Sequence, residues 1–194
     1  MSLAGPDQIK AAHEGFWNWI FEENDGPNHP LNVSQGGEAY KQLGNMLIVA
    51  GSLQGAGQKD RSLRIPKGVE SIFVPADNVV CTKSEGDGST DQELITKANS
   101  DIQGAAGNVG ISVNDNPQKV DLLEPHLFTL NIKRMIDGTC RNENGQPTLR
   151  GRQPPIDTMA AAACYYAVVP AKDLASGDRI KVSGRNINVT YTVK

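Results

Sequence analysis

The sequence predicts a mainly β protein, an antiparallel β-sandwich of jelly-roll type with an N-terminal helix and one internal helix. Two observations carry this prediction. Brief runs of alternating or continuous apolar residues recur at close spacing, and 20 glycines and 11 prolines supply many turns between them. Strands do not alternate with long helical patterns, which disfavours a parallel sheet of the Rossmann or TIM type.

The bulk properties fit one compact domain. The chain has 194 residues, of which 38% are hydrophobic, and a formal net charge of -3 at pH 7. We expect residues 1–44 to form a helix and a loop that pack on a sandwich domain of residues 45–194. The small net charge disfavours a general nucleic-acid binder. No run of eighteen apolar residues occurs, so we expect no membrane-spanning helix.

The first element is a helix that Asp7 is expected to cap and that ends before residues 25–30, DGPNHP. Its apolar residues recur at helical spacing: Ile9, Ala12, Phe16, Trp19 and Ile20. Trp17 and Phe21 lie partly off this stripe, so we expect the helix to pack across a sheet. Stacking of Trp17 and Trp19 on a sugar is the alternative, but their helical spacing favours a place in the core.

Beyond residue 45 the patterns are those of strands. Residues 46–50 are continuously apolar, which is typical of a central strand buried on both faces. Alternation and turn residues further predict a hairpin of residues 62–65 and 69–74, a strand at 109–113 with a turn after it, a strand at 127–132, and a terminal hairpin of residues 179–183 and 187–193.

Residues 85–93, EGDGSTDQE, crowd four carboxylates around two glycines. An EF-hand calcium loop requires glycine at its sixth position and glutamate at its twelfth. Starting the loop at either of the first two acids places Thr90 or Gln92 at the sixth position, so neither register fits. Thr90 and Glu93 instead have the spacing of a helix capping box. The segment is interpreted as the start of the internal helix, with a calcium site of another kind as the remaining alternative.

The three cysteines show no zinc-binding spacing, because neither a CxxC nor a paired CxxC/HxxxH pattern occurs. Cys164 lies in an apolar run and is predicted to be a small core residue. Cys81 and Cys140 are the better pair for a disulfide, although three buried thiols would explain the sequence equally well.

Charge is unevenly distributed along the chain. Acids outnumber bases in residues 70–101, and bases outnumber acids in residues 133–152. Two solvated loops of opposite sign explain this pattern, and an anion-facing loop is the sharper alternative. Residues 137–157 lack periodicity, and a loop that long in a compact domain is a candidate for function. The candidate ligand-binding residues lie in such loops and turns: Asp77, Asn78, Glu85, Asp87, Arg150 and Arg152.

One stretch of the chain resembles a family signature. The residues that carry the resemblance are Phe73, Pro75, Asn78 and Cys81, then Glu85, Gly86, Gly88, Thr90, Glu93 and Leu94. This order is similar to that of a widespread group of uncharacterised prokaryotic proteins that are usually predicted to be exported. The resemblance covers most of residues 16–194 and is dense only in residues 72–94. It implies a β-sandwich in an extracytoplasmic setting, and it assigns no activity and no catalytic residue.

The residue patterns do not identify a reaction. The histidines, His13, His29 and His126, show no metal-binding spacing, and no GxSxG nucleophile motif occurs. The leading interpretation is a non-enzymatic exported domain that binds a protein partner or a glycan through its loops, without a cofactor. Two alternatives stay open: a hydrolase or metal-assisted enzyme that uses Asp77, Glu85 and a histidine, and a structural subunit of an assembly.

The expected location is the periplasm or the cell exterior, and this expectation rests on the resemblance. The first residues lack the basic and apolar regions of a signal peptide. Met1 to Leu3 are interpreted as an added leader that takes the place of an export signal.

Overall fold

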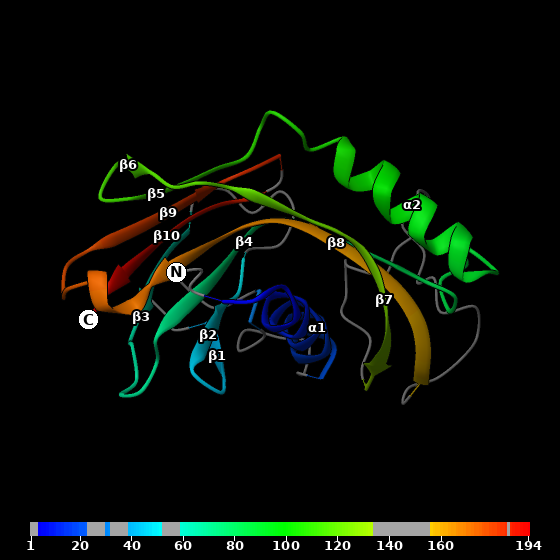
Figure 1. The fold of residues 1–194 in the computed structure, drawn as a ribbon, viewed down its shortest axis with the longest axis horizontal. Helices are drawn as coiled ribbons and strands as arrows, with labels where there is room; N and C mark the ends of the chain where they lie inside the picture. Colours follow the sequence, from blue (N-terminus) through cyan, green and yellow to red (C-terminus); the bar gives the residue numbers. More distant parts are fainter. Residues whose placement is uncertain (1–3, 23–29, 32–38, 52–58, 134–155, 186) are drawn as a thin grey trace.

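The structure is a computed structural model that describes residues 4–22, 30–31, 39–51, 59–133, 156–185 and 187–194. Within these residues the fold is mainly β, with two five-stranded sheets and two α-helices (Figure 1). In chain order the elements are α1 (Pro6–Glu22), β1 (Tyr40–Leu43), β2 (Met46–Val49), β3 (Lys59–Leu63), β4 (Ser71–Thr82), α2 (Asp91–Gln103), β5 (Gly110–Val113), β6 (Asn116–Pro117), β7 (Asp121–Ile132), β8 (Ile156–Pro170), the short 3-10 helix η1 (Ala171–Asp173), β9 (Arg179–Ser183) and β10 (Asn188–Val193).

Both sheets are mixed. The first has the strand order β1-β2-β4-β8-β7, and the second has the order β3-β10-β9-β5-β6. Most neighbours are antiparallel, but β2 pairs with β4 and β3 pairs with β10 in parallel. The prediction of a purely antiparallel fold is therefore wrong. Apolar alternation shows where a strand lies and which face is buried, but it carries no information on the partner strand.

The predicted hairpin of residues 62–65 and 69–74 is wrong for the same reason. β3 and β4 follow each other in the chain, yet β3 joins the second sheet beside β10, whereas β4 joins the first sheet between β2 and β8. Gly68 in the connection has a φ of 89°, a left-handed conformation that glycine adopts without strain. The turn therefore carries the chain from one sheet to the other.

The first sheet is covered on both faces (Figure 1). α1 lies against its concave face, where apolar side chains of α1, β2, β4, β7 and β8 form one core cluster. On the opposite face, the second sheet covers one end of the long strands and α2 covers the other end. A second cluster joins Ile72 and Val74 of β4 to Val182 and Tyr191 of the second sheet. The two sheets thus share an apolar core.

The centre of strand β8 carries only small side chains. It carries four consecutive alanines, Ala160–Ala163, which are all fully buried. Because neighbouring residues of a strand point to opposite faces, Ala160 and Ala162 belong to the cluster under α1, whereas Ala161 belongs to the cluster under α2. These small side chains allow a helix to approach the strand closely from either side.

The N-terminal helix forms as predicted, with one difference at its start. α1 begins at Pro6, a residue whose fixed φ suits the first helical position, so Asp7 lies in the first turn and does not cap the helix. Trp17 and Trp19 are only 8% and 7% exposed, and both belong to the core cluster under the helix. Their predicted packing in the core is confirmed.

The C-terminal half of α1 also covers the edge of the first sheet. The Asn18 Oδ1 atom accepts a hydrogen bond from the backbone N–H of Asn131 at 3.0 Å. The backbone carbonyl of Phe21 accepts one from the N–H of Lys133 at 3.2 Å. An edge strand exposes backbone groups that can pair with another chain. α1 therefore shields both the apolar face and part of the open edge of β7.

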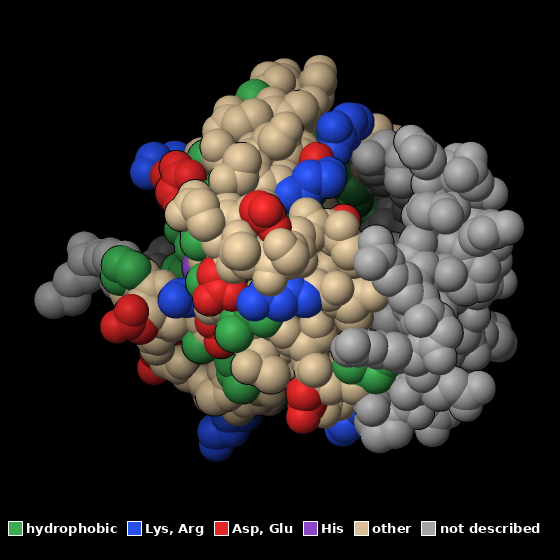
Figure 2. All heavy atoms as spheres, turned by 90° about the vertical axis from the view of Figure 1, so that its right-hand side faces the viewer, with side chains coloured by type: hydrophobic (Ala, Val, Ile, Leu, Met, Phe, Trp, Pro, Cys, Tyr) green, Lys and Arg blue, Asp and Glu red, His purple; other side chains and the backbone are tan. Residues whose placement is uncertain are grey.

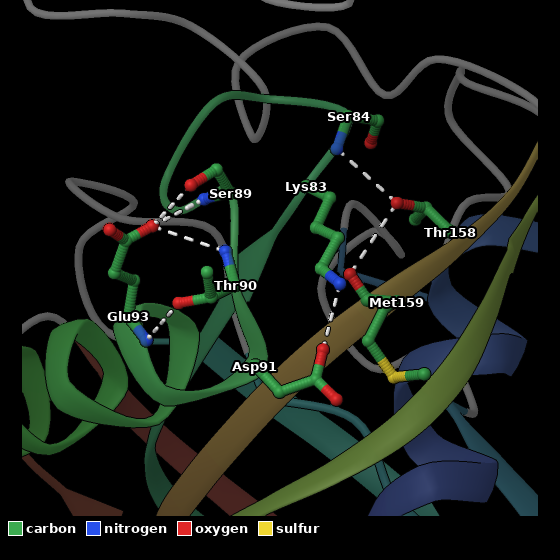
Figure 3. Close-up of polar contacts among 8 residues, drawn as sticks. All are labelled: Lys83, Ser84, Ser89, Thr90, Asp91, Glu93, Thr158 and Met159. Carbon is green, nitrogen blue, oxygen red and sulfur yellow. Dashed lines mark hydrogen bonds and ion pairs between the residues drawn. The ribbon is translucent and has the colours of Figure 1, made fainter.

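The internal helix α2 begins with the predicted capping box (Figure 3). The backbone N–H of Glu93 donates to Thr90 Oγ1 at 3.2 Å, and Glu93 Oε2 accepts from the N–H of Thr90 at 3.1 Å. The backbone N–H and the hydroxyl of Ser89 donate to the same oxygen, each at 2.7 Å. These bonds, those from Ser89 foremost, lower the pKa of Glu93. The helix-start interpretation of residues 85–93 is confirmed.

The remaining strand predictions are largely confirmed. β2 lies between β1 and β4 with all four residues buried, and β9 and β10 form the terminal hairpin. β5 and β6 are joined by Asn114 and Asp115, whose φ values of 49° and 66° are typical of a tight hairpin turn. The expected helix-and-loop segment 1–44 also contributes β1 to the first sheet. No helix in the described part of the chain combines the length and apolarity that a membrane crossing requires.

Candidate functional site

The ligand-binding residues predicted from the sequence do not meet at one place. Asp77 and Asn78 are neighbours on β4 and face opposite sides of the first sheet, because Asn78 contacts α1 and Asp77 faces Arg185 of the second sheet's terminal hairpin. Glu85 and Asp87 lie beyond the end of β4, in the connection to α2. The predicted residues therefore do not form one site.

Three of the predicted residues cannot be placed. Arg150 and Arg152 lie outside the described residues, and so does Cys140, the proposed disulfide partner of Cys81. Cys81 itself is a buried free thiol.

Asp77 is a buried carboxyl with a distant cation. The side chain is 7% exposed, and its Oδ2 atom lies 4.0 Å from Nε of Arg185. Burial raises the pKa of Asp77, while the charge of Arg185 opposes this shift. Asp77 and His126 lie on opposite faces of the first sheet. An active site that uses both Asp77 and His126 would require the two side chains to lie on the same face of the sheet.

The acids after β4 hold the connection to α2 in shape. Asp87 Oδ2 accepts from the backbone N–H of Thr82 at 2.8 Å, and Thr82 Oγ1 accepts from the N–H of Glu85 at 3.1 Å. Lys83 forms an ion pair with Asp91 at 2.7 Å (Figure 3). Acidic and basic side chains are interspersed on this side of the molecule (Figure 2). Within the described residues, no group of three or more His, Cys, Asp and Glu side chains is placed to hold a metal ion.

A β-bulge in β4 turns Asn78 toward α1. The pairing with β8 shifts between Pro75 and Asp77, which leaves Ala76 as the extra residue. Ala76 and Asp77 therefore both face away from α1, and Asn78 faces it. Strict alternation from Phe73, which lies on the α1 face, would place Asn78 on the opposite face.

A second bulge, in β7, turns His126 toward α1. The pairing with β8 shifts between Leu123 and His126, so that Glu124 and Pro125 lie opposite a single residue. Leu123 and Asn78 both lie opposite Cys164 of β8 in the register. The two bulges therefore direct Asn78 and His126 to the α1 face from the two strands that flank β8.

α1 places a third polar side chain between them. His13 is fully buried, and the centroid of its ring lies 5.3 Å from that of His126. Trp17, one turn further along the helix, donates from Nε1 to His13 Nε2 at 3.1 Å. The Oδ1 atom of Asn78 lies 3.0 Å from the same nitrogen. We refer to His13, Glu14, Trp17, Asn78 and His126 as the imidazole cluster.

The hydrogen bonds fix the tautomer of His126. Its Nδ1 lies 3.3 Å from the carbonyl oxygen of Glu124, which can only accept, so this Nδ1 carries the proton and Nε2 is bare. Nε2 of His13 has two partners that favour opposite tautomers, because the indole N–H of Trp17 can only donate to it and the Oδ1 atom of Asn78 can only accept from it.

Two ring nitrogens of the cluster lack a partner. Neither Nδ1 of His13 nor Nε2 of His126 has a hydrogen-bond partner within the described part of the chain. The two rings are neighbours, with their centroids 5.3 Å apart. Buried polar atoms are normally hydrogen-bonded, so these two nitrogens are an exception.

Burial keeps both rings uncharged. Burial, followed by the nearby His126, lowers the pKa of His13 to about 3, while Asn78 opposes the shift. Burial also lowers the pKa of His126, against the effect of the Glu124 carbonyl. The Oε1 atom of Glu14 lies 4.0 Å from Nε2 of His126, and burial raises the pKa of this carboxyl. The cluster thus contains two neutral histidines and, at its rim, the half-buried carboxyl group of Glu14.

Proline is the sequence signal for this cluster. A proline inside a strand removes a backbone donor and is tolerated at bulges and edges. Pro75 and Pro125 both stand next to bulges in otherwise apolar strand patterns. The predicted strand at 127–132 is confirmed, but the predicted turn at Asp77 and Asn78 is wrong, because both residues lie inside β4. A shift in the phase of alternation at each proline would have placed Asn78 and His126 on the α1 face. His13 and Glu14 carry no local signal of their own.

The two cysteines within the described residues, Cys81 and Cys164, both have thiols with a raised pKa. Burial, followed by the nearby charges of Asp87 and Asp101, raises the pKa of Cys81 to about 12. Cys164 is fully buried, and burial raises its pKa well above the ordinary value. The thiolate is the reactive form of cysteine, so neither residue has the properties of a nucleophile. The predicted place of Cys164 in the core is confirmed.

A separate polar groove lies on the outer face of the second sheet. Its volume is about 450 Å³, and β5, β6, β9 and β10 supply its lining. The residues that line it are Gly110, Ile111, Ser112, Pro117, Lys181, Val182, Ser183, Asn188 and Thr190. The alternate residues Ile111 and Val182 point into the core shared by the two sheets, so the polar residues point outward. We call this feature the outer groove.

The polar residues of the outer groove form two rows across the strands. Strand pairing aligns Ser112, Lys181 and Thr190 in one row. It aligns Gly110, Ser183 and Asn188 in the other. Gly110 keeps the second row open, because a Cβ atom there would lie 2.9 Å from Ser183 Oγ. The groove therefore has a flat floor of backbone and short side chains.

Much of the hydrogen-bonding capacity of the outer groove is unused. The side chains of Ser112, Asn188 and Thr190 form no hydrogen bond within the described residues. Lys181 is paired with Asp115 at the rim, which offsets the positive charge of the groove. The arrangement offers hydroxyl and amide groups to a ligand without a strong net charge.

Comparison with known proteins adds no relative. No protein-family model, no curated protein and no solved structure matches the chain. The resemblance to an exported prokaryotic group stays a prediction.

Proposed function

We propose that the protein is an exported, non-enzymatic β-sandwich domain that binds a glycan in the outer groove. The observation that carries the proposal is the pair of polar rows on the second sheet, with an unused hydroxyl group at Ser112 and an unused amide group at Asn188. Sugar hydroxyls both donate and accept hydrogen bonds, as these side chains do.

Three features favour a neutral glycan over other ligands. The Lys181 charge is offset by Asp115, so the groove has little to attract an anion. Pro117 offers an apolar ring at one end of the first row, where the apolar face of a sugar can pack. The groove is an open channel on a sheet and suits an extended chain of small units. The proposed site lies on a sheet face, apart from the loops that the sequence suggested as the binding region.

The sandwich architecture is part of the proposal. The apolar cluster between the first and second sheets supports it, because two stacked sheets that share a core define a sandwich. The location outside the cytoplasm is supported by the resemblance in residues 72–94. Fractionation of cells that express the full-length reading frame tests the location, and a purely cytoplasmic protein would contradict it.

Binding to a panel of neutral oligosaccharides tests the function. We expect one class to raise the melting temperature by mass action. Asn188→Ala should weaken that binding roughly tenfold, since a lost hydrogen bond is worth on the order of 1 kcal/mol, and Ser112→Phe should abolish it by filling the groove. Thr192→Ala is the matched control, because Thr192 lies on β10 outside the groove lining. The proposal fails if no neutral oligosaccharide binds, or if binding survives Ser112→Phe.

A further inference from the structure

We propose that His13 and His126 form an acid-labile latch that holds α1 on the first sheet. The latch consists of the two neutral imidazoles, one from α1 and one from β7, which are buried with their ring centroids 5.3 Å apart. Nδ1 of His13 and Nε2 of His126 have no hydrogen-bond partner within the described residues. This packing is favourable only while both rings are neutral, because a buried charge without a partner is costly. The latch is independent of the outer groove, which lies on the second sheet.

Protonation of either ring places a positive charge inside this buried pair. The charge would lie beside a second imidazole whose ring centroid is 5.3 Å away, in a site with little access to water. On His126 the new N–H can turn toward Glu14 Oε1, which lies 4.0 Å away. The polar contacts of His13 within the described residues are Trp17 and Asn78, and neither of these carries a charge.

The charged groups around the two rings do not rescue the protonated state. On α1, Glu14 attracts a proton on His126, while Lys10 repels it. Among the described residues of β7, the backbone carbonyl of Glu124 and the ring of Phe128 contact His126, and neither group titrates. β4 contributes Phe73 and Asn78, which do not titrate.

β8 adds no charge either. It directs Cys164 and Tyr166 to this face, and burial raises the pKa of both groups, so both are neutral in acid. Uncompensated protonation therefore favours the open state, in which α1 has left the sheet and both imidazoles reach water.

Linkage gives the expected size of the effect. In the open state the histidines titrate near the ordinary pKa of 6.5, while in the docked state they stay neutral to lower pH. Each histidine that gains a proton on opening raises the opening equilibrium constant about fivefold over the first pH unit below 6.5, and the rise approaches about tenfold per unit at lower pH. The buried aromatic side chains of α1 keep the closed state dominant, so the latch changes the frequency of opening and not the average fold.

Amide hydrogen exchange of α1 tests the latch. After correction for intrinsic rates, we expect the opening constant of α1 to rise up to roughly thirtyfold from pH 6.5 to pH 5.5, since two histidines can take up protons. Amides of β9 and β10 should keep their protection. His126→Gln should reduce the rise to about fivefold, and His29→Gln, the control at the third histidine, should leave it unchanged.

Three results would overturn the proposal: exchange of α1 that does not depend on pH, loss of protection in β9 and β10 in step with α1, or an unchanged rise in His126→Gln. If His126→Gln does not fold, the imidazole resonances of the wild-type protein decide. His13 and His126 must both titrate below 6.5, and a normal titration of either one contradicts the latch.

Discussion

At the scale of single residues, polar side chains in this protein act mainly through specific partners. Thr90 and Glu93 cap α2, Asn18 satisfies an edge amide of β7, and Asp87 orders the turn after β4. Each replaces a bond that water would otherwise make with the backbone. Their effect on stability should follow from the bond that is lost and not from the charge that is removed.

Thr90→Ala tests this view. Loss of the cap leaves a backbone N–H of the first turn without its partner, and the free energy of unfolding should fall by about 0.5–2 kcal/mol. Urea denaturation measures the change. Ser100→Ala is the control, because Ser100 is exposed on the same helix, and it should change stability by less than about 0.5 kcal/mol. Equal effects of the two substitutions would contradict the role of the cap.

At the scale of elements, α1 is the lid of the first sheet. It buries Phe16, Trp17, Trp19, Ile20 and Phe21 against that sheet, and it covers backbone donors at the β7 edge. Each large apolar side chain that is fully buried contributes about 1.5–3 kcal/mol. The helix is therefore part of the folding unit and not an appendage.

Deletion of residues 1–22 should expose an apolar face and a strand edge together. We expect the shortened protein to bind the dye ANS strongly and to elute from a size-exclusion column as aggregates, because Phe73, Phe128 and Leu130 lose their cover. The full-length chain at the same concentration is the reference. A monomeric, dye-silent product would show that the first sheet is stable without its helix.

At the scale of the whole molecule, the shared core makes the two sheets interdependent. Ile72 and Val74 of β4 and Ala167 and Val169 of β8 pack in the same cluster as the strands of the second sheet. Unfolding of either sheet would expose the apolar face of the other.

A single unfolding transition should result at neutral pH. Both tryptophans of the chain, Trp17 and Trp19, lie on α1, so tryptophan fluorescence reports on that helix, whereas far-ultraviolet circular dichroism reports mainly on the sheets. We expect the two signals to give the same urea midpoint at pH 7.5. A fluorescence midpoint at clearly lower urea would show that α1 unfolds independently and that the fold is not one cooperative unit.

Local patterns predicted elements well and their partners badly. The capping box at Thr90 and Glu93, the apolar strand at residues 46–50 and the terminal hairpin are each encoded by adjacent residues, and each is confirmed. The parallel pairs β2–β4 and β3–β10 join residues far apart in the chain, so no local signal specifies them.

The same limit explains the sites. The imidazole cluster depends on two bulges that reverse the phase of alternation, and it combines residues as distant as His13 and His126. The outer groove depends on strand register, which aligns Ser112 with Lys181 and Thr190. Neither arrangement is visible until the pairing of the strands is known.

The alanine run of β8 has a consequence for how the two helices can be studied. Ala160 and Ala162 face α1, and Ala161 faces α2. A bulkier residue acts as a wedge on one side of the strand only, because the pleat directs consecutive side chains to opposite faces. Ala162→Val should therefore displace α1 and leave α2 in place, whereas Ala161→Val should displace α2 and leave α1 in place. Substitutions in this one strand can thus perturb the packing of α1 and the packing of α2 separately.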